Sequence, residues 1–178
     1  SDVSAVDLLE DESQERKSSL LRHIRRSGHF SPFEHASFTF AIDGLSRIAS
    51  HQLVRHRIAS YSQQSQRYVE MRGPDAITPP SIGEVPALKR KFEEAAQTAH
   101  SLYTELIEHG VPKEDARYIL PHGWSTRLVM TMNARELHHF FTLRLCRRAQ
   151  WEIRDLARGM LIAVRSVAPR LFEEAGPS

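Results

Sequence analysis

The sequence contains a single cysteine, Cys146, among its 178 residues. One cysteine cannot close an intramolecular disulfide or build a cysteine-based metal site, so we expect neither feature. A chain without disulfides fits a reducing compartment, and we expect the cytoplasm. No apolar run reaches the roughly 20 residues of a membrane-spanning helix, and no secretory signal is visible, so no membrane partner is expected.

Lysine is also scarce, because 20 of the 24 basic residues are arginine and only 4 are lysine. A GC-rich genome would explain the total count. Arginine nevertheless offers a planar, permanently charged fork that suits phosphates and carboxylates. The formal net charge of +2 implies no polyanionic partner. A G-x-G-x-x-G fingerprint is missing as well, so no Rossmann dinucleotide domain is expected.

The composition that remains is that of an ordinary globular protein, with 40% apolar and 26% charged residues, and the length suits one domain. Periodicity predicts helices at 11–27, 45–57, 88–106, 113–120, 133–147 and 153–171. Strands are predicted at 36–42 and 126–132, with a further short strand at 67–71. Residues 58–67 are polar and break the periodicity. The predicted fold class is α+β, mostly helical with a small antiparallel or mixed sheet.

One stretch, residues 55–68 (RHRIASYSQQSQRY), concentrates polar and cationic side chains. Its first three residues, Arg55, His56 and Arg57, end a predicted helix, where cations complement the negative pole of the helix dipole. A polar loop of Ser, Gln and Arg follows, which also suits recognition of a phosphate or a sugar. From the chemistry alone, an ordinary helix cap and a phosphate site both stay open.

The same stretch resembles the signature of the flavin-dependent thymidylate synthases: Arg-His-Arg, two residues, Ser, four residues, Ser, one residue, Arg. The sequence matches every fixed position, namely Arg55, His56, Arg57, Ser60, Ser65 and Arg67. Residues 28–40 (GHFSPFEHASFTF) resemble the loop and strand that face the flavin and the folate in that family. Residues 114–121 (EDARYILP) and 133–153 resemble its later motifs, so the resemblance covers nearly the whole chain. It implies the family's fold in one domain, residues 1–178, and we expect a short N-terminal strand and helix to be missing.

The resemblance implies an FAD-dependent methyltransferase that converts deoxyuridine monophosphate (dUMP) into thymidine monophosphate (dTMP) in de novo dTMP biosynthesis. Methylenetetrahydrofolate would supply the methylene group, reduced FAD the hydride, and NADPH the electrons that reduce the flavin. Without a Rossmann domain, NADPH would bind transiently. The resemblance also implies a homotetramer with active sites at subunit interfaces.

Site residues are carried over from the same motifs. Those implied for dUMP are Gln52, Leu53, Val54, Arg55, Gln63, Gln64, Ser65, Gln66, Arg67, Arg117 and Arg144. Those implied for FAD are Ser37, Arg55, His56, Arg57, Gln63, Asn133, Ala134, Arg135 and His139. His35 and Tyr68 would lie near the flavin and folate rings. His139 stands where some relatives have Asn, and Arg148 where some have His.

Arg144 is the predicted catalytic residue. It continues an apolar helical stripe with Leu137, Phe140 and Phe141, and an arginine on such a face needs a partner or a path to water. By resemblance it contacts the uracil ring and stabilises its ionised form, which is electrostatic catalysis. Cys146 is two residues further on, is expected to point to the opposite side of the helix, and is expected to have no nucleophilic role.

Gln52 and Arg55 are three apart and are expected on one helix face, whereas for Arg117 a surface ion pair with Glu114 is an alternative to a nucleotide contact. Glu136-x-x-His139 is half of a di-iron motif, but no second copy exists, so no metal is expected. Eight arginines between 135 and 170 could suggest RNA binding. Acidic residues interrupt them and aromatic platforms are sparse, so no nucleic-acid partner is expected.

Overall fold

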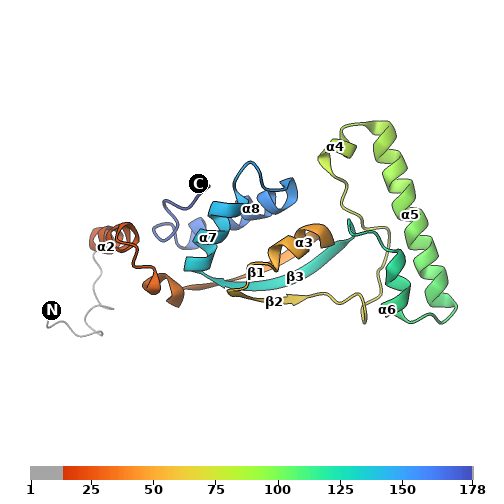
Figure 1. Cartoon of the computed structure of the whole chain (residues 1–178), viewed down its shortest axis with the longest axis horizontal. Coiled ribbons are helices and arrows are strands. Elements are labelled where there is room, and N and C mark those ends of the chain that lie inside the picture. The colour runs from red at the N-terminus through yellow and green to blue at the C-terminus, as the bar shows by residue number, and fades with distance from the viewer. Residues whose placement is uncertain (1–13, 178) are drawn as a thin grey trace.

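The computed structural model describes residues 14–177 and contains a three-stranded antiparallel sheet in the order β1-β3-β2 (Figure 1). The strands are β1 (Ser37–Ser46), β2 (Ala59–Gln63) and β3 (Ser125–Asn133). The predicted α+β class with a small sheet is confirmed, and the sheet is purely antiparallel. Among residues 14–177, none of the helices combines the length and the apolar character needed to cross a bilayer.

Helices α3 (Arg47–Leu53), α7 (Ala134–Arg144) and α8 (Trp151–Val167) lie on one face of this sheet (Figure 1). The central strand alternates, so Leu128, Met130 and Met132 are buried beneath the helices while Arg127 and Val129 are exposed. Together with the apolar stripes of α7 and α8, these residues form the main core. Helix α2 (Gln14–Arg26) and the 3-10 turn η1 (Ser31–His35) precede β1.

A helical arm connects β2 to β3 and stands away from the sheet (Figure 1). It contains α4 (Pro80–Gly83), α5 (Pro86–Glu108), α6 (Lys113–Ala116) and the turn η2 (Arg117–Ile119). The arm has a second, smaller core around Tyr103 and Trp124, which are both 1% exposed. Trp124 immediately precedes β3, so the arm is anchored at the start of the central strand.

Most predicted elements are present, with shifted ends. Helix 11–27 corresponds to α2, although residues 11–13 lie outside the described part of the chain. Helix 45–57 is shorter than predicted because β1 runs on to Ser46, through a bulge in which Gly44 adopts a φ of 71°. Two predictions were wrong: the polar stretch contains β2, and residues 67–71 form turns instead of a strand. Periodicity missed β2 because an edge strand with one solvent-exposed face does not require a continuous apolar run.

A buried carboxylate joins α8 to the junction between β1 and α3. Glu152 Oε1 accepts the backbone N–H of Ser46 at 2.6 Å, and Oε2 accepts the Ser46 hydroxyl at 2.5 Å. The Ser46 oxygen in turn accepts the N–H of Ala49 and so caps α3. Glu152 and Ser46 are 8% and 2% exposed, so water cannot replace these bonds.

We expect Glu152→Ala to lower the free energy of unfolding by roughly 2–4 kcal/mol, because it leaves the buried N–H of Ser46 without an acceptor. Urea unfolding followed by circular dichroism measures the change. Glu94→Ala is the control: it removes only an exposed ion pair with Arg90 at 3.9 Å and should change the stability by less than about 0.5 kcal/mol. Equal effects of the two substitutions would contradict the role given to Glu152.

Candidate functional site

The end of β3 and the start of α7 bring several predicted site residues together. Asn133 ends the strand, pairs with Ser37 of β1, and caps α7 by accepting the N–H of Glu136 at 2.9 Å. Ala134 is buried and donates its N–H to the carbonyl of Ala36 at 2.8 Å. Two of the residues predicted to contact FAD, Ser37 and Asn133, are therefore direct neighbours across the sheet.

Arg144, the last residue of α7, is half-buried and has partners inside the protein. Its Nε donates to Nε2 of His56 at 3.0 Å, and its Nη2 donates to the carbonyl of Gln52 at 3.3 Å. On the other side of the imidazole, His56 Nδ1 lies 3.0 Å from Oε1 of Glu136. The arginine predicted from the apolar stripe is thus joined to the last turn of α3 through Gln52 and to His56, which follows that helix.

The imidazole of His56 is held neutral by its surroundings. Burial lowers its pKa most, the hydrogen bond to Glu136 opposes this, and the nearby charge of Arg144 lowers the pKa further. Because Arg144 only donates, Nε2 of His56 must accept, and the proton sits on Nδ1, facing Glu136. The side chain of His56 is therefore fully engaged within the protein.

The polar loop of the signature has its own internal contacts. Gln63 Nε2 donates to the hydroxyls of Ser50 at 3.0 Å and Thr126 at 3.2 Å. The Ser65 hydroxyl accepts the N–H of Arg67 at 3.2 Å, and Arg67 forms an exposed ion pair with Glu114 at 2.6 Å. The ion pair considered for Arg117 is thus made by Arg67.

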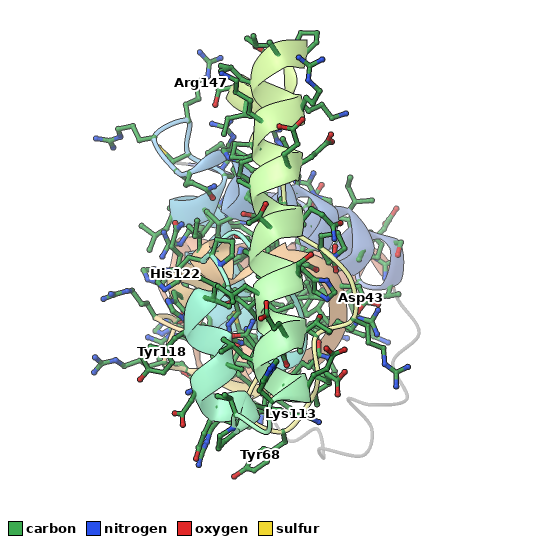
Figure 2. All side chains as sticks on the ribbon, turned by 90° about the vertical axis from the view of Figure 1, so that its right-hand side faces the viewer. Asp43, Tyr68, Lys113, Tyr118, His122 and Arg147 are labelled. Atoms are coloured by element: carbon green, nitrogen blue, oxygen red, sulfur yellow. The ribbon has the colours of Figure 1, made fainter. Side chains whose placement is uncertain are left out.

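Arg117 instead lines a cavity of about 370 Å³, here named the basic pocket. Its lining residues come from α3, the signature loop and the end of the arm: Arg47, His51, Gln66, Arg117, Tyr118, Leu120, Pro121 and His122. Figure 2 shows Tyr118 and His122 on the same side of the molecule, to the left of α5. None of these lining residues is acidic.

The charges of the basic pocket repel one another. Burial and then the neighbouring Arg117 lower the pKa of Arg47. Burial and then Arg47, His122 and Arg55 lower the pKa of His51. A cluster of cations without a carboxylate in its lining favours an anion, since a bound anion would relieve this repulsion.

A second cavity of about 270 Å³ lies beside α7 and is named the α7 cavity. Its lining consists of Arg25, Phe30, Arg135, His138, His139 and Thr142. Arg135 also forms an ion pair with Glu34 of η1. The cavity therefore combines two guanidinium groups with aromatic rings beside the residues predicted to contact FAD.

Other predicted site residues lie elsewhere. Leu53 is 0% exposed and belongs to the core, whereas Tyr68 is 72% exposed beneath the guanidinium of Arg67. The prediction that Gln52 and Arg55 share a helix face was wrong, because α3 ends at Leu53. Val54, Arg55 and Arg57 are exposed beyond it, and His35 is exposed at the end of η1. The helical position of Cys146 was also wrong, because α7 ends two residues before it.

Sequence reasoning missed several residues of these sites. Arg47 and His51 are four apart on α3, a spacing that places two cationic groups on one face, and this signal was available. His122 offered no such signal because it comes from a distant segment. Glu136 was considered only as a metal ligand. Its carboxylate, an imidazole nitrogen of His56 and one of His139 lie within 4.8 Å of one another.

A small α+β domain with two arginine-lined cavities has the character of a protein that binds phosphorylated ligands. Comparison with known families agrees with this class. The family model described as thymidylate synthase complementing protein matches residues 1–170.

The chain is also similar to individual proteins that share one name. A flavin-dependent thymidylate synthase of Geobacter sulfurreducens is 52% identical over 98% of this chain and 76% of its own length. One from Clostridium tetani is 44% identical over 100% of this chain and 78% of its own length. One from Sulfolobus acidocaldarius is 54% identical over 85% of this chain and 58% of its own length. The chain belongs to the flavin-dependent thymidylate synthase family.

The phenol of Tyr61 provides a test of the packing around the signature. Its single proton is shared between the carbonyls of Leu53 and His56, each 2.9 Å from the phenol oxygen. Burial, followed by the charge of Glu136, raises the pKa of Tyr61 to about 12. The folded-state pKa exceeds the ordinary value of about 10, so this contribution to stability is complete below pH 10 and is lost as the pH rises through 12.

We therefore expect the free energy of unfolding to fall more steeply between about pH 10 and about pH 12 in the wild type than in Tyr61→Phe. Urea unfolding at several pH values in this range measures the slopes. Tyr118→Phe, which alters a tyrosine that is 86% exposed, should keep the wild-type slope. A Tyr61→Phe slope equal to that of the wild type would refute the assignment.

Proposed function

We propose that this chain synthesises dTMP from dUMP, using methylenetetrahydrofolate as the one-carbon donor, FAD as the redox cofactor and NADPH as the reductant. Family membership supports the reaction, and the arrangement of Arg144 against His56 and Gln52 is the observation that supports it most directly. The single cysteine fits a cytoplasmic enzyme.

The basic pocket is the proposed site for the phosphate of dUMP. A phosphate monoester carries nearly two negative charges, and guanidinium groups bind its oxygens through charge-assisted hydrogen bonds. Arg47 and Arg117 supply two such groups, and Gln66 adds an amide from the signature loop. The repulsion between the two arginines favours an anion over a neutral ligand.

Helix α3 connects this pocket to the proposed reaction centre. His51 lines the basic pocket, while the carbonyl of the next residue, Gln52, holds Arg144. We propose that the guanidinium of Arg144 contacts the uracil ring and stabilises the negative charge that develops on it. A charge placed in advance requires little reorganisation during the reaction, which is the advantage of electrostatic catalysis.

The α7 cavity fits part of a flavin dinucleotide. Arg25 and Arg135 match a diphosphate, and Phe30 and His139 offer rings against which a flat ring system can stack. At about 270 Å³ the cavity is below the roughly 300–1,000 Å³ typical of sites for drug-sized ligands, so one chain surrounds only part of FAD. When bound, FAD would supply the hydride that converts the transferred methylene group into a methyl group.

We propose that neighbouring copies complete these sites in a homotetramer. The outer face of the sheet, with Val129 at 45% exposure, and the exposed residues His35 and Tyr68 are available to a second copy and to folate. No metal and no nucleic acid are part of this proposal.

Tritium release from ring-labelled dUMP tests the reaction in the presence of FAD, NADPH and methylenetetrahydrofolate. We expect release by the wild type and a decrease of at least about 100-fold for Arg144→Ala, the size expected when a charge-stabilising donor is removed. Arg158→Ala, which alters an exposed arginine of α8 paired with Asp155, serves as the control and should retain the rate. Absence of tritium release from folded, FAD-loaded wild type would contradict the proposed function.

Substitution in the basic pocket tests the phosphate site separately. We expect Arg117→Ala to raise KM for dUMP by about 10-fold or more, because a charge-assisted hydrogen bond is worth roughly 1.5–3 kcal/mol. Added salt should reduce the difference in KM for dUMP between this variant and the wild type, because salt screens the attraction between the arginine and the phosphate. Steady-state kinetics at two ionic strengths provide the measurement, with Arg90→Ala on α5 as the matched control. An unchanged KM would exclude Arg117 as a phosphate ligand.

A further inference from the structure

A chain of hydrogen bonds connects the first turn of α7 to its last residue through His56. Glu136 Oε1 lies 3.0 Å from Nδ1 of His56, and Nε2 of the same ring lies 3.0 Å from Nε of Arg144. The side chains of His56 and Glu136 are only 4% and 9% exposed. The ring of Phe140 packs edge-on against the imidazole, with ring centroids 5.0 Å apart, and limits its rotation.

The direction of every proton in this chain is fixed by chemistry. A guanidinium has only donors, so Nε2 of His56 accepts from Arg144. A neutral imidazole then carries its proton on Nδ1 and donates it to Glu136. The carboxylate of Glu136 can only accept, so it favours the tautomer with the proton on Nδ1, which leaves Nε2 free to accept from the arginine.

We propose that Glu136 is a positioning residue for Arg144, acting through the imidazole of His56. This inference deepens the function proposed above and rests on it for the consequence in catalysis. Burial of a carboxylate carries a desolvation penalty, so fixing a neighbouring group is a better reason for Glu136 to be there than a gain in stability.

The consequence for Arg144 is a guanidinium held at two points. Nε is used by His56, and one hydrogen of Nη2 is used by the carbonyl of Gln52. Within residues 14–177, Nη1 makes no hydrogen bond to the protein, which leaves this group for a ligand. A long side chain otherwise loses rotamer entropy when a ligand orders it. Glu136 and His56 make that ordering part of the folded state.

The same atoms also resemble a metal site, since ligand atoms of His56, Glu136 and His139 lie close together. Arg144 argues against this use. A metal on Nδ1 of His56 would move the ring proton to Nε2, where it would face the N–H of Arg144. Two donors would then oppose each other beside a cation, so the hydrogen-bond chain and the metal exclude each other.

The tautomer is tested without reference to catalysis. Nitrogen-15 spectra of histidine-labelled protein distinguish a protonated Nδ1 from a protonated Nε2. We expect His56 to carry its proton on Nδ1 in the wild type. We expect this preference to weaken in Glu136→Gln, whose neutral amide accepts less strongly than a carboxylate and can also turn its NH₂ toward the ring. A wild-type His56 protonated on Nε2, or stoichiometric binding of Zn²⁺ that His139→Ala abolishes, would overturn the proposal.

The coupling to Arg144 is tested by a double-mutant comparison of tritium release. We expect Glu136→Gln to lower kcat by about 10- to 100-fold with KM for dUMP changed less than about 3-fold, as is typical when an outer hydrogen-bond partner is lost. In the Arg144→Ala background the same substitution should have almost no further effect. A full additional decrease there would overturn the proposal, because Glu136 would then act independently of Arg144.

Two controls separate this inference from the proposed function. Glu173→Gln alters an exposed carboxylate 3.8 Å from Arg22 and should leave kcat unchanged. Urea unfolding establishes that each variant is folded. If the wild type released no tritium, the proposed function would fail while the tautomer measurement would still decide the arrangement of Glu136, His56 and Arg144.

Discussion

The attachment of α8 to the β1–α3 junction through Glu152 and Ser46 is the contact on which the basic pocket and the position of Arg144 depend. It fixes the first turn of α3, and that short helix forms a wall between two environments. One side presents His51 to the basic pocket, and the carbonyl of Gln52 holds Arg144. A buried carboxylate that accepts a backbone N–H and a hydroxyl is an effective anchor because it leaves no donor unsatisfied.

The surroundings of Arg144 and the basic pocket are built in opposite ways. Around Arg144, a carboxylate and an imidazole complete the hydrogen bonds, and the side chain is fixed in advance. In the basic pocket, Arg47 and Arg117 line one cavity without an acidic lining residue, and a bound anion would relieve the repulsion between them. The first arrangement suits a residue that must act in one position, and the second suits a site that must attract an anion.

Periodicity predicted the long helices and the two longer strands because each buries one face against the main core. It missed β2, whose alternate residues remain half-exposed at the sheet edge. The signature identified the segment that contains His56, but it could not show that this side chain faces inward toward Glu136. Nor could it assemble the basic pocket, because its lining comes from α3, the signature loop and the segment around His122. Tertiary contacts of this kind carry no local pattern.

The strand order β1-β3-β2 has a consequence for folding during synthesis on the ribosome. The central strand is the last of the three to be synthesised, and the paired residues Thr39 and Thr131 are 92 positions apart. Among the strands of residues 14–177, neither edge strand has a partner until the helical arm has emerged, so this sheet cannot grow stepwise from a hairpin. Pairing between such distant segments slows folding and leaves strand edges open for longer. The arm, with its own small core, is able to collapse first and to shorten the distance that the late central strand must close.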